Sequence, residues 1–335
     1  MSPPAQRSRQ SLDHAIVRGV AWTGAASWVA QILTWVSTLL VVRILHPDDY
    51  GIVALAALYL GLATMLSEFG IGTAVITMRD LPSRQIAQLN SVALLVALGA
   101  LLLAWLLAVP MAQVLGSPRL VTLIRVMSVG LVVAALGSVP TALLQKSLRF
   151  RFLAAAQIAQ SLTGAAASLL LATFGAGYWA LALGPLLGQV VMSVMAVIGA
   201  PCGYVWPDRR QLKPALQFSR TVILERFCWY LYTGSDRFII GKLIGEAAVG
   251  LYSVAASFGM MAVEKVAVLV LRVAPAAFAE VQRDPAALRR YLLSMTEGLS
   301  IVTFPISIGI ALVAGDTVHL LFGEHWAGAI APLRI

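Results

Sequence analysis

The sequence predicts an all-α protein that crosses a membrane many times, folded as two six-helix lobes in parallel repeat with an incomplete second lobe. The 335 residues are 59% hydrophobic and 12% charged, whereas soluble domains are about 45–50% apolar and about 25% charged. Apolar runs of membrane-crossing length recur along the chain, and two of the loops between them repeat one another at a fixed spacing. This composition, with a mean hydropathy of +0.85, argues against a soluble enzyme built on one packed core.

Nine apolar runs are long enough to span a bilayer, which takes about 20 helical residues. The first run extends past the length of a secretory signal core and has no cleavage site behind it, so we expect it to stay in the membrane. A tenth run begins near Trp326. The nine runs cover residues 20–44, 51–78, 88–112, 120–144, 153–174, 178–200, 216–243, 249–277 and 291–314.

The basic residues predict a cytoplasmic N-terminus, because Lys and Arg near the ends of spans stay on the cytoplasmic side. With that orientation, fifteen of the 24 basic residues lie in cytoplasmic segments. Four lie outside, namely Arg43, Arg119, Arg237 and Lys242. The formal charge of +9 therefore reflects topology. A nucleic-acid-binding protein would gather its basic residues on one face, so we expect no nucleic-acid partner.

The loops after the first and seventh runs share a pattern. Arg43 is followed by two aliphatic residues, five variable positions, Gly51 and another aliphatic residue, and Lys242 opens the same pattern, which ends at Gly250. The two copies lie 199 residues apart. Six spans in each repeat would insert both lobes in the same direction.

The repeat predicts three parts of the chain. They are an N-lobe over 1–200 with transmembrane helices 1–6, a Pro-rich basic cytoplasmic linker over 201–215, and a partial C-lobe over 216–335. The partial lobe would hold helices 7–9 and the start of helix 10. We therefore expect a chain truncated at its C-terminus, the alternative being a nine-span protein with a short amphipathic tail.

Five short motifs occur in order at the expected helices. They are Gly19-Val-Ala-Trp22, Val41-Val-Arg-Ile-Leu-His-Pro-Asp-Asp-Tyr-Gly51, Glu68-Phe-Gly-Ile-Gly-Thr-Ala74, Ser235-Asp-Arg-Phe-Ile-Ile-Gly241 running on to Gly250-Leu-Tyr252, and Gly323-Glu-His-Trp326. In this order they resemble the Wzx-like polysaccharide and oligosaccharide flippases of the multidrug/oligosaccharidyl-lipid/polysaccharide (MOP) exporter superfamily. The resemblance covers essentially the whole chain, although the last helices of the family pattern are absent.

The resemblance implies a MATE-like, multi-pass protein of the bacterial inner membrane. Such a flippase moves an undecaprenyl-diphosphate-linked oligosaccharide across that membrane for exopolysaccharide, O-antigen or capsule synthesis, by alternating access of two rocking lobes. It would be no enzyme and need no cofactor, and the sequence has no P-loop motif. The implied partners are membrane lipids, a coupling proton or sodium ion, and polysaccharide polymerase or export proteins.

Cationic residues within the spans predict the substrate contacts. A charge at mid-membrane costs at least about 2.5–3.5 kcal/mol, so it faces a cavity or a partner. Arg226 shares a helix face with Tyr230, and Lys265 lies close to the middle of the eighth span. A guanidinium can bind phosphate oxygens bidentately, and an aromatic face can stack on a sugar ring. We predict that Arg226, Lys265 and Tyr230 bind the diphosphate sugar; alternatively, Arg226 pairs with a carboxylate on another helix.

Three carboxylates are predicted to carry the coupling ion: Glu68, Glu225 and Glu264. For Glu68 the alternative is a structural carboxylate bonded to a neighbouring helix, because small residues at helical spacing beside it, including Gly61, allow close approach.

Two mid-span prolines, Pro185 and Pro305, lack an amide hydrogen and are candidate hinges, the alternative being static kinks. Beside Pro185, the Gly184-x-x-x-Gly188 motif fits a close helix contact equally well.

Two other functions are weighed against the flippase. A multidrug cation antiporter of the same superfamily favours an acidic cavity, whereas the deep charges here include Arg226 and Lys265. A membrane glycosyltransferase or ligase needs a sizeable outer loop with catalytic groups, and these outer loops are only several residues long. We expect no metal site, because the four histidines are scattered, and we expect Cys202 and Cys228 to be ordinary packing residues.

Overall fold

The computed structural model describes residues 28–68, 72, 75–76, 81–207, 228, 230–281 and 284–334. The side chains of residues 65–68 and of most residues from 261 to 280 lie outside this description. Within the described ranges the chain is helical and contains no strand. The prediction of an all-α protein is confirmed.

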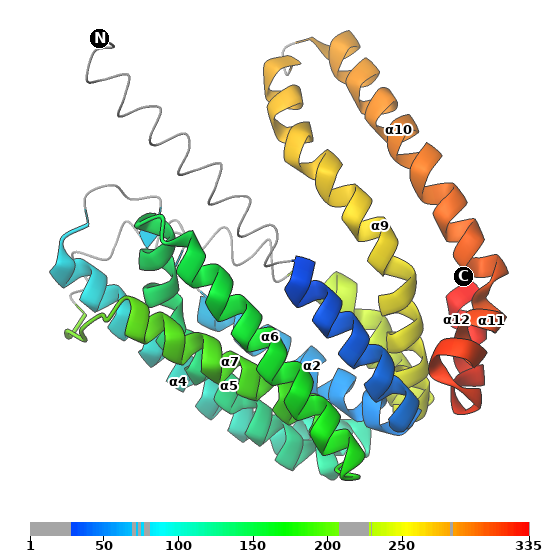
Figure 1. The fold of residues 1–335 in the computed structure, drawn as a ribbon, viewed down its shortest axis with the longest axis horizontal. Coiled ribbons are helices and arrows are strands. Elements are labelled where there is room, and N and C mark those ends of the chain that lie inside the picture. Colours follow the sequence, from blue (N-terminus) through cyan, green and yellow to red (C-terminus); the bar gives the residue numbers. More distant parts are fainter. Residues whose placement is uncertain are drawn as a thin grey trace. The chain divides into compact units, whose positions relative to one another are not determined.

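The described helices follow the predicted spans closely (Figure 1). An apolar helix over Trp28–Ile44 comes first, and residues 230–243 are helical as well. The labelled helices are α2 (Pro47–Glu68), α4 (Ser83–Leu115), α5 (Arg119–Lys146), α6 (Phe150–Thr173), α7 (Trp179–Gly199), α9 (Glu246–Val281), α10 (Pro285–Leu312), α11 (Ala314–Thr317), η1 (Val318–Phe322), η2 (Glu324–Ala329) and α12 (Ile330–Arg334).

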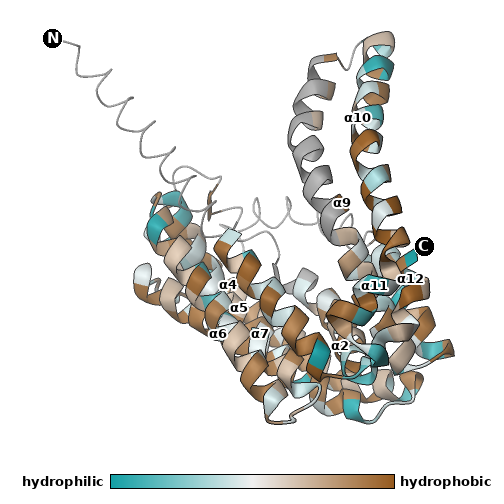
Figure 2. Ribbon diagram, turned by 45° about the vertical axis from the view of Figure 1, so that its right-hand side comes forward, coloured by the Kyte–Doolittle hydropathy of each residue, from teal (hydrophilic) through white to brown (hydrophobic). Residues whose placement is uncertain are grey.

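Five of these helices, α4, α5, α6, α7 and α10, are long and apolar enough to cross a membrane, counting only the described residues. Their hydropathy is highest along the helix bodies, and hydrophilic residues gather at several helix ends (Figure 2). The first turns of α10, for example, carry Arg289 and Arg290. This distribution suits helices whose middles lie in hydrocarbon and whose ends meet water.

Local sequence explains where two of the helices begin. Pro47 and Pro285 occupy the first helical positions of α2 and α10, where the missing proline amide has no bond to lose. The His46 amide donates to Asp49 Oδ2 over 3.2 Å. At α10 the Asp284 carboxylate accepts from the backbone amides of the residues two and three positions on, over 3.0 and 3.1 Å.

The chain divides into two compact units. One unit comprises Met1–Leu45 with Ile52–Gly245, and the other comprises His46–Gly51 with Glu246–Ile335. The first turn of α2 therefore groups with α9 and the helices after it. The lobe boundaries given by the sequence repeat stay a prediction.

In the first unit, α4 packs along α5, and α7 packs along both α5 and α6. One face of α4 is a row of buried alanines at spacings of three and four residues, which lets helices approach closely. This row consists of Ala93, Ala97, Ala100, Ala104, Ala108 and Ala112.

The α6–α7 crossing depends on glycine. A β-carbon at Gly188 would lie 2.6 Å from the Gln160 carbonyl oxygen and 3.4 Å from the Gly164 Cα atom. A β-carbon at Gly184 would overlap the Ser168 hydroxyl. The close-packing interpretation of the Gly184-x-x-x-Gly188 motif is confirmed, and α7 continues as a helix through Pro185.

We expect Gly188→Val to destabilise the protein, because the new side chain would meet a backbone oxygen that cannot rotate away. Overpacking of this kind costs about 1–3 kcal/mol. The matched control is Gly99→Val in α4, where a β-carbon would meet no atom within 4 Å. The midpoint of thermal unfolding in detergent should fall for Gly188→Val and stay close to the parent value for Gly99→Val. Equal midpoints for the two variants would contradict the packing account.

The start of the predicted linker packs on α4. Gln88 and Asn90, 1% and 2% exposed, donate from their side-chain amides to the backbone carbonyls of Trp206 and Gly203 over 3.5 and 3.4 Å. The Val205 amide in turn donates to a serine hydroxyl of α4 over 3.0 Å. Residues 201–207 are therefore anchored to the first unit, while residues 208–215 lie outside the described part.

The core of the second unit is aromatic. Trp326 is 0% exposed and Phe322 is 2% exposed, and both lie in the irregular helical stretch before α12. Tyr50, from the first turn of α2, meets the Trp326 ring edge-on with centroids 5.3 Å apart, and Phe258 of α9 meets Phe322 at 5.5 Å. The four rings join the first turn of α2 to α9 through η1 and η2.

Candidate functional site

The predicted charges lie on helices whose side chains the structure describes only in part. Glu68 is the last residue of α2, and Glu264 and Lys265 lie in the middle of α9. The side chains of these three residues are outside the description, and so are Glu225 and Arg226 altogether. Their roles in binding and coupling stay predictions.

Tyr230 is the predicted substrate contact whose side chain is described. Its hydroxyl donates to the Leu58 carbonyl of α2 over 2.6 Å, and a β-carbon at Gly61 would lie 2.7 Å from its ring carbon Cε2. The half-buried ring thus covers Gly61 in this conformation. The small-residue face predicted beside Glu68 is a place of close helix approach, at least at Gly61. A sugar contact by Tyr230 would use the ring, or a conformation in which the bond to Leu58 is broken.

A second close approach lies one turn after Tyr230, on the helix of residues 230–243. A β-carbon at Gly234 would overlap the Leu58 side chain. A β-carbon at Gly61 would displace the Tyr230 side chain, and one at Gly234 would displace the end of the Leu58 side chain. The Tyr230 hydrogen bond and these close approaches hold the 230–243 helix against α2.

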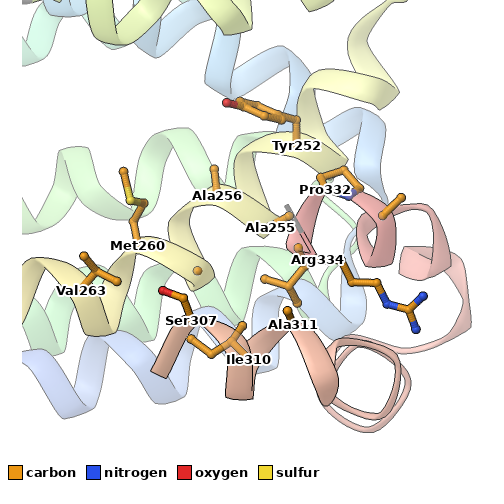
Figure 3. A pocket seen from close by; sticks show the side chains of 13 residues that line it. Tyr252, Ala255, Ala256, Met260, Val263, Ser307, Ile310, Ala311, Pro332 and Arg334 are labelled. Atoms are coloured by element: carbon orange, nitrogen blue, oxygen red, sulfur yellow. The ribbon is translucent and has the colours of Figure 1, made fainter. Parts of the chain in front are cut away.

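A cavity of about 510 Å³ lies in the second unit between α9, α10 and α12 (Figure 3). Its lining is mostly apolar, with Ala255, Ala256 and Met260 from α9. Ser307 contributes a hydroxyl from α10, and Arg334 is the one charged residue among the described residues that line it. Such a lining suits hydrocarbon better than a sugar. The cavity was not predicted from the sequence.

The described part of the chain contains no candidate metal site, because no three His, Cys, Asp or Glu side chains in it come close enough to hold an ion. His319 pairs with Glu324 over 3.1 Å at the surface.

One known protein family matches most of the chain. The model described as "Polysaccharide biosynthesis protein" matches residues 40–331, which is most of the chain. The chain belongs to this family. The resemblance found in the sequence motifs is thereby confirmed.

Curated bacterial proteins are similar to it along nearly the whole chain. The lipopolysaccharide biosynthesis protein WzxC of Escherichia coli (strain K12) is 26% identical over 97% of this chain and 67% of its own length. The succinoglycan biosynthesis transport protein ExoT of Rhizobium meliloti (strain 1021) is 24% identical over 94% of this chain and 64% of its own length. The chain thus spans about two thirds of the length of these relatives.

Solved structures share the fold of this family member. The lipid II flippase MurJ, in an inward closed conformation, gives a TM-score of 0.69 at 12% identity, over 93% of this chain and 70% of MurJ. An inward-facing multidrug resistance MATE family transporter of the MOP superfamily gives 0.60 at 20% identity, over 91% of this chain and 76% of the transporter. The predicted MATE-like, polytopic membrane fold is confirmed.

Proposed function

We propose that the protein is a flippase, not an enzyme, that moves an undecaprenyl-diphosphate-linked oligosaccharide from the inner to the outer leaflet of the bacterial inner membrane. The observation that carries this proposal is the family match over residues 40–331. Relatives named for lipopolysaccharide biosynthesis and for succinoglycan biosynthesis transport support it. The product would be a surface polysaccharide, and the glycan would depend on the strain's own glycosyltransferases.

The substrate contacts that we propose are Arg226, Lys265 and Tyr230. A diphosphate carries negative charge that must cross a low-dielectric region, so cations lining the path offset its desolvation. Lys265 lies in the middle of α9, and Arg226 lies within the predicted seventh span. Both positions are far enough from the span ends to place a cation inside the membrane, where it could bind the diphosphate. Tyr230 adds an aromatic ring on the face that it shares with Arg226.

Coupling and movement are assigned to other residues. Glu68, Glu225 or Glu264 would carry a proton or sodium ion, since a carboxylate in a membrane can alternate between a neutral and a charged form. Pro185 and Pro305 would allow bending of α7 and α10 between inward-open and outward-open states. Polysaccharide polymerase or export proteins would receive the flipped substrate.

A deletion strain tests the function. Loss of the gene should abolish the surface polysaccharide and leave lipid-linked oligosaccharide on the inner leaflet, and the complete protein should restore export. Resistance to cationic dyes should not change. Normal polysaccharide together with a loss of dye resistance would instead identify a multidrug cation antiporter.

Cys202 tests the proposed orientation, because it lies in the linker that we place in the cytoplasm. In a Cys228→Ser background, a membrane-impermeant maleimide should label Cys202 in broken cells and fail to label it in intact cells. Burial raises the pKa of the Cys202 thiol, so less of the reactive thiolate forms at neutral pH and labelling should be slow there and accelerate as the pH rises. Rapid labelling in intact cells would show that Cys202 faces the outside, contrary to the proposed orientation.

A further inference from the structure

The predicted cytoplasmic segments of the first unit carry far more basic than acidic residues. Between residues 79 and 213 these segments hold eight basic residues against two acidic ones, Asp80 and Asp208. The basic residues are Arg79, Arg84, Lys146, Arg149, Arg151, Arg209, Arg210 and Lys213. Residues 81–207 contain no Asp or Glu at all. The helices α4 to α7 therefore offer no carboxylate to neutralise this end of the unit, which favours an anionic partner.

Two arginines of this set lie where the linker meets the helices. Arg149 Nη1 donates to the carbonyl of Gly199, the last residue of α7, over 2.5 Å. Arg84 lies one turn before Gln88 and on the same face of α4, and Gln88 donates to the Trp206 carbonyl. Both arginine side chains are exposed. One guanidinium thus lies near each end of the described part of the linker.

The linker also exposes two aromatic residues beside these arginines. Tyr204 is 52% exposed and Trp206 is 82% exposed, while the Val205 amide and the Trp206 carbonyl are bonded to α4. Gln88 begins the predicted span over 88–112, so the linker crosses α4 at the inner boundary of the membrane. Tyr and Trp favour this level because each ring has an apolar body and a polar tip.

We infer that this end of the first unit binds the head group of an anionic glycerophospholipid. The site consists of Arg84, Arg149, Tyr204 and Trp206. The guanidiniums bind the phosphodiester, and the rings lie at the level of the glycerol and the first acyl carbons. A free phosphate ion would use the arginines alone and leave both rings in water, so the rings favour a lipid.

The leaflet follows from the predicted orientation, which places this end of the unit in the cytoplasm. None of the four residues is among those that we assign to the transported substrate, so lipid binding can be measured without transport. Because the backbone of residues 203–206 is bonded to α4, a bound lipid holds the start of the linker at the membrane surface.

Lipid titration of the purified complete protein tests the site. Delipidated protein in a non-ionic detergent is titrated with phosphatidylglycerol or phosphatidylcholine, and bound lipid is counted by native mass spectrometry. A cation beside an anionic lipid strengthens binding about fivefold. Arg84→Gln with Arg149→Gln should therefore weaken phosphatidylglycerol binding about 25-fold and leave phosphatidylcholine binding unchanged. Equal phosphatidylglycerol affinity in this variant and the parent would overturn the site.

The matched control is Arg43→Gln with Arg119→Gln, which removes two exposed cations from the predicted outer side. Both lipid affinities should stay at the parent value. A loss of phosphatidylglycerol binding as large as that of the inner variant would show that only the total charge matters, and would also overturn the site.

Two single variants keep the test decisive if loss of the Arg149 bond to Gly199 impairs folding. Arg84→Gln alone should weaken phosphatidylglycerol binding about fivefold, and Trp206→Ala should weaken it severalfold. Inorganic phosphate in large excess should leave the lipid bound to the parent protein. Displacement by phosphate, or parent affinity in both single variants, would contradict a lipid site built from these residues.

Discussion

Alanine in place of Arg226 or Lys265 is expected to abolish complementation of a polymer-export defect by the complete protein, without loss of membrane insertion. A hydrogen bond to a charged group contributes about 1.5–3 kcal/mol, and the diphosphate would lose such bonds at the point where water cannot replace them. Each substitution should therefore lower transport by about tenfold to more than a hundredfold. Export of polysaccharide in the deletion strain is the measurement.

Two further variants make this result specific to the proposed site. Arg226→Lys keeps the charge but loses the planar fork that binds phosphate bidentately, so it should transport at an intermediate rate. Arg43→Ala removes an exposed cation from the end of the Trp28–Ile44 helix and should export normally. If both Arg226→Ala and Lys265→Ala complement fully, the assignment of these residues to the substrate path is wrong.

Trp326→Ala is expected to cause the largest loss of stability among single substitutions in the second unit. The side chain is 0% exposed and contacts the rings of Tyr50, Phe322 and His325. Truncation of a buried Phe or Trp to Ala costs about 3–5 kcal/mol, because it removes apolar burial and leaves a cavity. Thermal unfolding of the purified protein in detergent, followed by the remaining monodisperse fraction, measures the effect.

Trp206→Ala is the matched control for that experiment. Trp206 is 82% exposed, and the bond it accepts from Gln88 uses its backbone carbonyl, which the substitution keeps. Its unfolding midpoint should stay near that of the parent. If Trp326→Ala unfolds at the same temperature as Trp206→Ala, the aromatic core does not hold the second unit together.

The helices were predictable from the sequence because an apolar run in a bilayer has few alternatives to a helix. The run predicted over 249–277 is the helix α9, Glu246–Val281, and the run over 178–200 is α7, Trp179–Gly199. The ends differ by a few residues because caps and first turns, such as Asp284 before α10 and Arg289 and Arg290 near its start, are polar and extend beyond the apolar part. Hydropathy indicates how many residues of a span lie in hydrocarbon, whereas the helix includes the polar turns at either end as well.

Contacts made through backbone carbonyls were not predictable. Tyr230 was expected to face a sugar because it shares a stripe with Arg226, yet its hydroxyl donates to the Leu58 carbonyl. Gln88 and Asn90 likewise bind carbonyls of residues 201–207, which the sequence presented only as a linker. Every residue has a carbonyl, so the sequence carries no mark of which one is used.

The internal repeat identifies equivalent residues but does not predict which of them are in contact. The spacing of 199 residues identifies Gly51 and Gly250 as equivalent positions, and the structure adds that these positions meet, since a β-carbon at Gly250 would lie 3.0 Å from the Gly51 amide nitrogen. A repeat tells which residues correspond, but the axis that relates them decides whether they touch. The partnership of Tyr50 with Trp326 has no counterpart in the repeat and is known from the structure alone.

Translocation by the purified complete protein tests the flippase most directly. The protein is reconstituted into vesicles that contain a fluorescent undecaprenyl-diphosphate oligosaccharide on the inner leaflet only, and the label reaching the outer leaflet is measured with an impermeant quencher. We expect quenching to develop with wild-type protein, to accelerate under an imposed proton or sodium gradient, and to fall to the protein-free rate with Arg226→Ala. Quenching by the wild-type protein at the protein-free rate, with and without both gradients, would contradict the account.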